Sequence, residues 1–158
     1  MKLVKIYCGK LCSGKGWVIE DELKYDCDSV VRVSSIIKKF TKYQNRSDLQ
    51  KTAYLDDYVY NQLIKNINNH CKLMIDGIRQ PSILYKIIEY CNKHNIQYQL
   101  IWVYASEDIR RKRFSLRNEE QSFEQANQGD YNLGINEIEQ FINKNGIVLN
   151  NNKDIDYG

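Results

Sequence analysis

The chain has 158 residues, of which 42% are hydrophobic and 27% are charged, and its formal net charge is only +3. This length suits one domain with a substantial core over residues 1–158, and the composition excludes a disordered or low-complexity chain. So small a net charge makes the overall field a weak attractor of polyanions, and any anion site must be built locally.

The opening sequence MKLVKIYCGK holds an apolar run that is too short for a signal peptide or a membrane span, and no later stretch approaches spanning length. The five cysteines stand at irregular spacings, which predicts reduced thiols instead of a disulfide framework. We therefore expect a cytoplasmic protein without a membrane partner.

Five short runs rich in apolar, β-branched and aromatic residues alternate with helical stretches along the chain. This alternation predicts an α/β fold in which a five-stranded parallel sheet is flanked by helices on both faces. The predicted strands are residues 3–8, 29–33, 72–75, 98–104 and 147–149.

Helix signals fill the intervals between these strands. Capping boxes, a first-turn proline, an acidic first turn and a terminal glycine mark the helix ends. They predict helices that begin near Ser47, Pro81, Ser106 and Asn136, of which the first ends near His70 and the last at Gly146.

Residues 9–15 read Gly-Lys-Leu-Cys-Ser-Gly-Lys and fit the G-x-x-x-x-G-K pattern of a phosphate-binding loop, directly after a predicted strand and before a helix. Glycines suit this loop because its backbone N–H groups must converge on one phosphate, and side chains would obstruct that approach. Lys15 then supplies a mobile cation for the β- and γ-phosphates. The pattern predicts ATP binding at this loop.

The residue after the loop lysine is Gly16, where a Ser or Thr hydroxyl would otherwise bind Mg²⁺ directly. Mg²⁺ is therefore expected to be held by the phosphates, water and a carboxylate. The Gly-Lys-Gly sequence resembles the adenylate kinase loop, in which Thr follows, whereas here Trp17 follows. The residues expected to contact ATP at this end are Gly9, Lys10, Leu11, Cys12, Ser13, Gly14, Lys15, Gly16 and Trp17.

Asp76 ends an apolar predicted strand, at the sheet edge where doubly wound folds bind ligands, and it would face the phosphate loop. The stretch from Asp76 to Gln80 resembles the Asp-Gly-Phe-Pro-Arg segment of nucleoside monophosphate kinases, with the Phe-Pro lost. The resemblance implies that Asp76 orders Mg²⁺ through water and can take the proton of an alcohol acceptor. Arg79 is explained equally well as an acceptor-binding residue and as a solvated helix-start residue.

Four arginines crowd into the helix predicted near Ser106 and its exit. Arg113 and Arg117 stand four apart on one face, where like charges repel, and an arriving phosphate would offset that cost. This run resembles a short form of the lid of nucleotide kinases, which implies that Arg113 and Arg117 act on the transferring phosphoryl group. An exposed basic helix paired with its own acidic first turn is the alternative.

The segments 32–37, 46–50, 76–84 and 130–135 together are similar to a group of short bacteriophage P-loop kinases. That group includes kinases of 5-hydroxymethylpyrimidines in DNA and neighbours the deoxynucleoside monophosphate kinases. The resemblance implies a three-layer P-loop kinase fold with a short lid, ATP and Mg²⁺ as cofactors, and the host cytoplasm as the location. By the same resemblance, the adenine lies near the C-terminal turn at Asn150 and Asn151.

The expected acceptor is hydroxymethylated pyrimidine in DNA, with a free deoxynucleoside monophosphate as the alternative. Gly16 and Trp17 also motivate a third hypothesis, a non-catalytic nucleotide-binding subunit. A DNA acceptor needs contacts to backbone phosphates and a flipped base. The basic residues Lys38, Lys39, Lys42 and Arg46 could make these contacts. They are explained almost equally well as cations that stabilise the C-terminus of a helix. The candidate acceptor residues are Ser34, Lys38, Arg46, Arg79 and Gln80, with Asp48 as a second candidate base beside Asp76.

Overall fold

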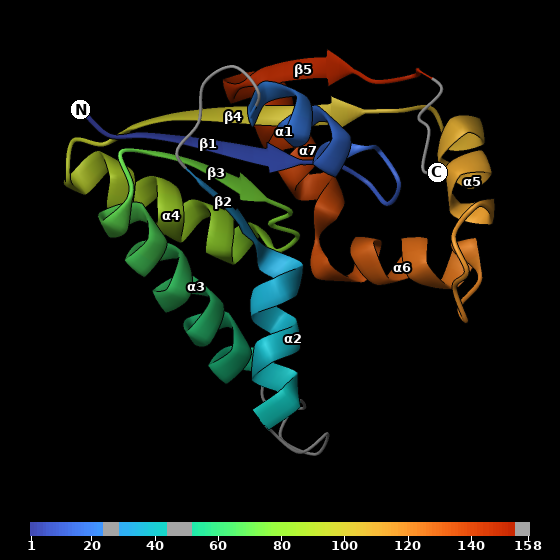
Figure 1. Cartoon of the computed structure of the whole chain (residues 1–158), viewed down its shortest axis with the longest axis horizontal. Helices are drawn as coiled ribbons and strands as arrows, with labels where there is room; N and C mark the ends of the chain where they lie inside the picture. Colours follow the sequence, from blue (N-terminus) through green and yellow to red (C-terminus); the bar gives the residue numbers. More distant parts are fainter. Residues whose placement is uncertain (24–28, 44–51, 154–158) are drawn as a thin grey trace.

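Five strands form a single parallel sheet with the spatial order β2-β3-β1-β4-β5 in the computed structural model, which describes residues 1–23, 29–43 and 52–153 (Figure 1). Each strand is followed by at least one helix before the next strand, so the parallel direction is reached through helical crossovers. The strands are β1 Leu3–Cys8, β2 Ser29–Arg32, β3 Lys72–Asp76, β4 Gln97–Tyr104 and β5 Ile147–Asn150.

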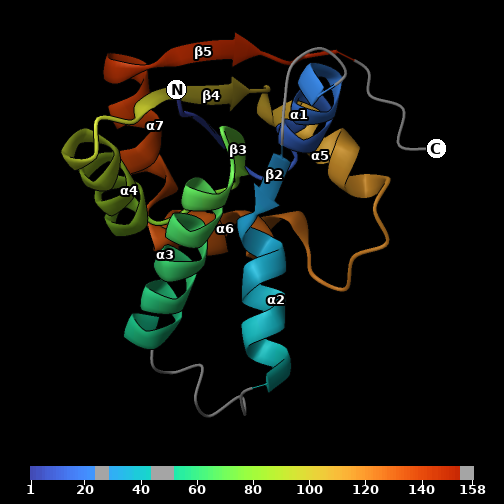
Figure 2. The same cartoon turned by 60° about the vertical axis from the view of Figure 1, so that its left-hand side comes forward.

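Seven helices surround this sheet within the described ranges. In two views α2 and α3 lie side by side and extend away from the sheet (Figures 1 and 2). The helices are α1 Lys15–Leu23, α2 Val33–Tyr43, α3 Thr52–Asn69, α4 Pro81–Lys93, α5 Glu107–Ser115, α6 Phe123–Leu133 and α7 Ile135–Asn145. Across the described part of the chain, no helix is both long and apolar enough to cross a bilayer.

Alternation of side chains along β1 divides the core into two layers. Ile6 and Cys8 belong to the larger cluster, which includes buried residues of α3, α4 and α7. Tyr7 faces the other way and packs with Ile19 of α1 and Met74 of β3. Because both faces are covered, the central strands are apolar almost throughout, as parallel sheets require. This arrangement confirms the predicted α/β fold with its five-stranded parallel sheet.

The predicted strands agree with the observed ones to within one residue, while the helix boundaries differ in two places. Val33 begins α2 instead of ending β2. The last helix follows Gly134, whose φ of 109° is left-handed, so Asn136 lies inside the helix and does not cap it. A Cβ on Gly134 would also approach Pro81 Cδ to 2.7 Å, so the junction between α6 and α7 packs directly on the start of α4.

Two capping boxes in the sequence had different outcomes. The capping box predicted at residues 47–50 lies outside the described residues. Helix α6 was not predicted at all, although Ser122 and Gln125 form a reciprocal capping box at its start. Its few apolar residues gave too weak a periodic pattern for a prediction.

The register of the strands brings three chain segments to one edge of the sheet. Asp76 at the end of β3 pairs with Tyr7 of β1 on one side and with Arg32 of β2 on the other. The loop after β1 therefore begins beside the side chain that ends β3. Parallel sheets bind ligands at this carboxyl edge, so the register itself positions the candidate site.

Candidate active site

The loop between β1 and α1 is held in a shape that only a few residue types permit. Cys12 and Gly14 have left-handed φ angles of 63° and 85°, and the Ser13 amide donates to the Lys10 carbonyl over 3.0 Å. A Cβ on Gly9 would lie 2.6 Å from the Val103 carbonyl oxygen, so a larger residue would displace the loop from the sheet. Alternation of right- and left-handed residues is the geometry of an anion-binding backbone nest.

Lys15 opens α1 and lies between the loop and β3. Its Nζ is 3.5 Å from the Gly9 carbonyl oxygen, so the side chain folds back over the loop. Burial lowers the pKa of this ammonium, and the nearby Asp76 carboxylate opposes that shift by favouring the charged form. The ammonium therefore lies over the loop, near the Gly9 carbonyl and within the field of Asp76.

Two thiols border the same loop. Burial raises the pKa of Cys8 to about 12, and it also raises the pKa of Cys12 against the opposing field of Arg117. Neutral thiols add no negative charge beside an anion, so they are compatible with a phosphate ligand.

Asp76 is the strand-end carboxylate beside the loop. Its side chain is only 14% exposed, and its Oδ2 lies 3.6 Å from the Nε of Arg32. The chain leaves the strand through Gly77, whose φ of +91° is left-handed and whose Cα faces Lys15 Cε. Asp76 therefore lies among cations from two elements, with Lys15 on the loop side and Arg32 on the β2 side.

A cavity of about 540 Å³ opens between the loop and the paired helices α2 and α3. On one side lie the loop and the start of α1. The opposite side is a helical wall, defined by Val33, Ser34, Ile37 and Lys38 of α2 and by Leu55, Asp56 and Val59 of α3. The predicted site residues that line this cavity are Cys12, Ser13, Gly14, Lys15, Gly16, Trp17, Ser34, Lys38, Asp76, Arg79, Gln80 and Arg117.

Asp56 is a polar residue of the helical wall that the sequence did not bring forward. It lies among apolar neighbours, and burial raises the pKa of its carboxyl while a side-chain hydrogen bond with Gln80 lowers it again. Leu55 and Val59 stand four residues apart on α3, at helical spacing, and both line the cavity. That spacing also places Asp56 beside them, which was the available signal.

Arg113 lies behind the loop and is absent from the cavity lining. It is 3% exposed, and its guanidinium donates to the carbonyls of Cys12 and Ser13 at 3.1 Å and to the carbonyl of Asn151 at 2.6 Å. Asn151 is also 3% exposed, and its side-chain amide donates a hydrogen bond to the Ser13 carbonyl over 2.9 Å. We call Arg113 and Asn151 the loop brace.

The placement of the loop brace corrects the prediction for Arg113, whereas the prediction for Asn151 stays a prediction. Arg113 was expected at the phosphates and Asn151 at the adenine, and both lie buried against loop carbonyls. Four-residue spacing put Arg113 and Arg117 on one helical face, whereas α5 ends between them at Ser115, with Leu116 as its C-cap. Only Arg117 reaches the cavity lining. Asn150, also predicted near the adenine, is exposed at the end of β5 and does not line the cavity.

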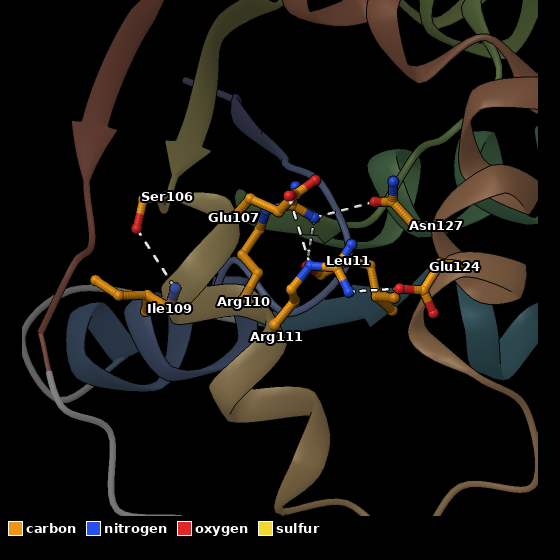
Figure 3. Close-up of polar contacts among 8 residues, drawn as sticks. All are labelled: Leu11, Ser106, Glu107, Ile109, Arg110, Arg111, Glu124 and Asn127. Atoms are coloured by element: carbon orange, nitrogen blue, oxygen red, sulfur yellow. Dashed lines mark hydrogen bonds and ion pairs between the residues drawn. The ribbon is translucent and has the colours of Figure 1, made fainter.

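The other two arginines of α5 are also engaged by protein groups (Figure 3). Arg110 is buried and donates to the Leu11 carbonyl over 3.3 Å and to Asn127 Oδ1 over 3.0 Å. Arg111 is more exposed and pairs with Glu107 and Glu124. Helix α5 therefore supports the loop from behind through buried arginines, in addition to presenting Arg117.

The remaining predicted loop residues and acceptor residues have distinct locations. Lys10 points away from the cavity toward Glu139, at 3.7 Å, and over the ring of Tyr131. Gly9 and Leu11 contribute backbone without lining the cavity. Arg46 and Asp48 lie outside the described residues.

Arg79 lines the cavity while its guanidinium pairs with Asp130 of α6 at 3.3 Å. Asp130 is 3% exposed, and its second oxygen, Oδ2, is buried with no hydrogen-bond partner within the described ranges. A buried carboxylate held this way fixes the direction of the arginine it pairs with. Asp130 is thus a positioning residue for Arg79.

The arrangement of the whole chain resembles two solved structures. Shikimate kinase from Bacteroides thetaiotaomicron matches 98% of this chain and 90% of its own, with a TM-score of 0.59 and 15% identity. TT1252 from Thermus thermophilus matches 97% of this chain and 90% of its own, with a TM-score of 0.63 and 12% identity. No protein-family model and no curated sequence matches the chain. At these identities the likeness establishes the fold, which is that of the P-loop kinases.

Proposed function

We propose that the chain is an ATP-dependent kinase that phosphorylates the hydroxymethyl group of a 5-hydroxymethylpyrimidine in DNA. One observation carries the proposal: the loop lysine Lys15 and the strand-end carboxylate Asp76 line the same cavity, opposite a largely apolar helical wall. A phosphoryl donor on the loop would then meet an acceptor held against α2 and α3. The likeness in fold to a shikimate kinase supports a phosphotransferase.

The residues of the loop fit a nucleoside triphosphate with Mg²⁺. The loop supplies a backbone nest, and Lys15 and Arg117 supply positive charge on the same cavity. No group of three or more possible metal ligands occurs in the described part of the chain. Asp76 would therefore hold the ion with water and phosphate oxygens, as Mg²⁺ readily permits. When bound, Mg²⁺ supplies positive charge that neutralises the phosphate oxygens.

The transfer assigns a separate role to each side chain. The acceptor oxygen forms a bond to the γ-phosphorus as the bond to the ADP oxygen breaks, and Asp76 takes the hydroxyl proton. Lys15 and Arg117 stabilise the negative charge on the transferring group. Arg32, 3.6 Å from Asp76, keeps the carboxylate oriented toward the reacting atoms.

The character of the helical wall favours an uncharged acceptor group. Asp56 places a carboxyl group on this wall among apolar side chains, where it would repel a dianionic phosphate. A hydroxymethyl base is neutral, and a base turned out of the DNA stack can enter a pocket of this kind. Lys38 lies on the same wall, and in this proposal it binds a DNA backbone phosphate.

A deoxynucleoside monophosphate kinase is the second candidate. It is favoured by two further cations in the cavity lining, Lys38 of α2 and Arg79 of the segment after β3. Those cations would bind the acceptor phosphate, and Asp56 would then have to lie near the base.

One assay separates these functions. The protein is incubated with γ-labelled ATP and, separately, with hydroxymethylated DNA, unmodified DNA and free deoxynucleoside monophosphates. Label on hydroxymethylated DNA is the expected outcome. Label on the monophosphates alone would replace the proposal with the second candidate, and bound ATP with no labelled acceptor would indicate a non-catalytic subunit.

Asp76→Asn tests the proposed chemistry directly. Loss of the carboxylate is expected to lower turnover at least about 100-fold, within the range attributed to general base catalysis, while ATP still binds. Asp57→Asn is the matched control, because Asp57 is an exposed carboxylate of α3 whose side chain is 67% accessible. Undiminished turnover in Asp76→Asn would remove this residue from the mechanism.

A further inference from the structure

The cavity lining includes a pair of polar side chains whose mutual hydrogen bond no step above uses. Asp56 of α3 and Gln80, the residue before α4, both line the cavity and share a side-chain hydrogen bond. Leu55, Val59 and Ile83, all apolar, line the same cavity. A polar ligand group that enters such surroundings must find a hydrogen-bond partner, so this pair decides which groups are accepted.

Gln80 is directed at Asp56 instead of at its own helix. It occupies the N-cap position of α4, with extended backbone angles, but its side chain makes no capping hydrogen bond. N-cap positions ordinarily carry Ser, Thr, Asp or Asn, whose short side chains cap the first turn. Here the longer amide is instead a hydrogen-bond partner of the Asp56 carboxyl on α3, which lowers the pKa that burial raises.

The hydrogen-bonding capacity of this pair is one-sided. An ionised carboxylate only accepts hydrogen bonds, and an amide that donates to it through nitrogen has only its oxygen to offer elsewhere. A ligand edge that meets the pair must therefore bring a donor. An amino group satisfies this requirement, whereas a carbonyl oxygen at the same place would face the carboxylate with no donor between them.

We propose that Asp56, positioned by Gln80, recognises the 4-amino group of a cytosine-type base, so that the acceptor is 5-hydroxymethylcytosine and not 5-hydroxymethyluracil. The inference rests on the proposed function for the position of the base. With the C5 hydroxymethyl group at Asp76 and the phosphate loop, the C4 substituent is the neighbouring polar group of the ring. That substituent is an amino group in cytosine and a carbonyl oxygen in uracil.

The test compares two acceptors that differ only at this substituent. Single-stranded oligonucleotides of one sequence carry a single 5-hydroxymethylcytosine or a single 5-hydroxymethyluracil, and kcat/KM is measured for each with ATP. The intact protein is expected to prefer the cytosine form by roughly 10- to 100-fold, the range for one unsatisfied buried polar group. Equal use of the two, or preference for the uracil form, overturns the proposal.

Variants assign the preference to the pair. Asp56→Asn keeps the shape of the side chain and adds an NH₂ donor, so the preference is expected to vanish or to reverse toward the carbonyl-bearing base. Gln80→Ala is expected to weaken it by several-fold, because Asp56 loses its partner. Asp57→Asn, next in the chain and exposed, is the control and leaves the preference unchanged. An unaltered preference in Asp56→Asn overturns the assignment.

A binding measurement keeps this result separate from the fate of the proposed function. Fluorescence anisotropy of the same two labelled oligonucleotides, and competition by dCMP and dTMP, report base preference without turnover. If no DNA is phosphorylated, the DNA-kinase proposal fails, while a cytosine preference in binding that Asp56→Asn removes still supports the role of Asp56. If binding shows no such preference, the role of Asp56 is wrong whatever the protein phosphorylates.

Discussion

The phosphate loop and the helical wall face each other across one cavity, yet their shapes depend on different kinds of contact. The loop is fixed by backbone requirements, with Gly9 against Val103 and left-handed angles at Cys12 and Gly14. The helical wall is made by side chains of two helices that pack on each other. A loop fixed by backbone geometry tolerates few changes, whereas a wall made of side chains adapts to different acceptors. This difference is how one fold serves many substrates.

Removal of the loop brace should produce the largest effect. Arg113→Met removes a guanidinium that donates to at least three carbonyls, of which the Ser13 carbonyl keeps a bond from Asn151. We expect the free energy of unfolding to fall by about 3 kcal/mol. The loss should be visible in chemical denaturation and as weaker ATP binding. Arg111→Met on the same helix is the control, since Arg111 is exposed and should change stability by less than about 0.5 kcal/mol. Equal effects in both variants would contradict the brace.

Arg117→Met should show whether Arg117 acts in catalysis or stabilises the phosphate loop. Arg117 lines the cavity, so its loss is expected to lower kcat by about 100-fold, as for other groups that stabilise transition-state charge, with little change in stability. Steady-state kinetics and a melting curve measure the two effects. A stability loss as large as that of Arg113→Met would mean that Arg117 also supports the loop.

Gly16→Ser should produce the smallest effect, and in the opposite direction. A Cβ at Gly16 meets no atom within 4 Å, so a hydroxyl side chain fits without strain. We expect the serine to add a direct Mg²⁺ ligand and to lower the Mg²⁺ concentration for half-maximal activity by several-fold. Gly16→Ala is the control, because it adds the Cβ without the hydroxyl. Identical Mg²⁺ dependence in both variants would show that the ion is held elsewhere.

The parts of the molecule that were predictable from sequence are those with local causes. The strands of the sheet follow from apolar runs, and the loop follows from glycines at fixed spacing. Ser106 was predicted to open α5 and does so, with its hydroxyl accepting from the Ile109 amide. In each case the residues that determine the structure are neighbours in the chain.

The parts that were not predictable depend on packing between distant elements. Nothing in the sequence near Arg113 indicates that its partners are the carbonyls of Cys12 and Asn151, because α5 meets the loop only in the folded chain. Asp56 was overlooked for a similar reason, since its significance comes from Gln80 on another segment. The sequence shows that arginines cluster in α5, whereas tertiary contacts decide which groups each guanidinium binds.

The brace also has a consequence for the order of folding. Asn151 bonds to a carbonyl 138 residues earlier in the chain, and Arg113 to one 100 residues earlier. Contacts between such distant residues carry a high entropic cost of closure and form late. Because synthesis proceeds from the N-terminus, the phosphate loop is made well before Arg113 and Asn151, and it takes its final form only after both have been made.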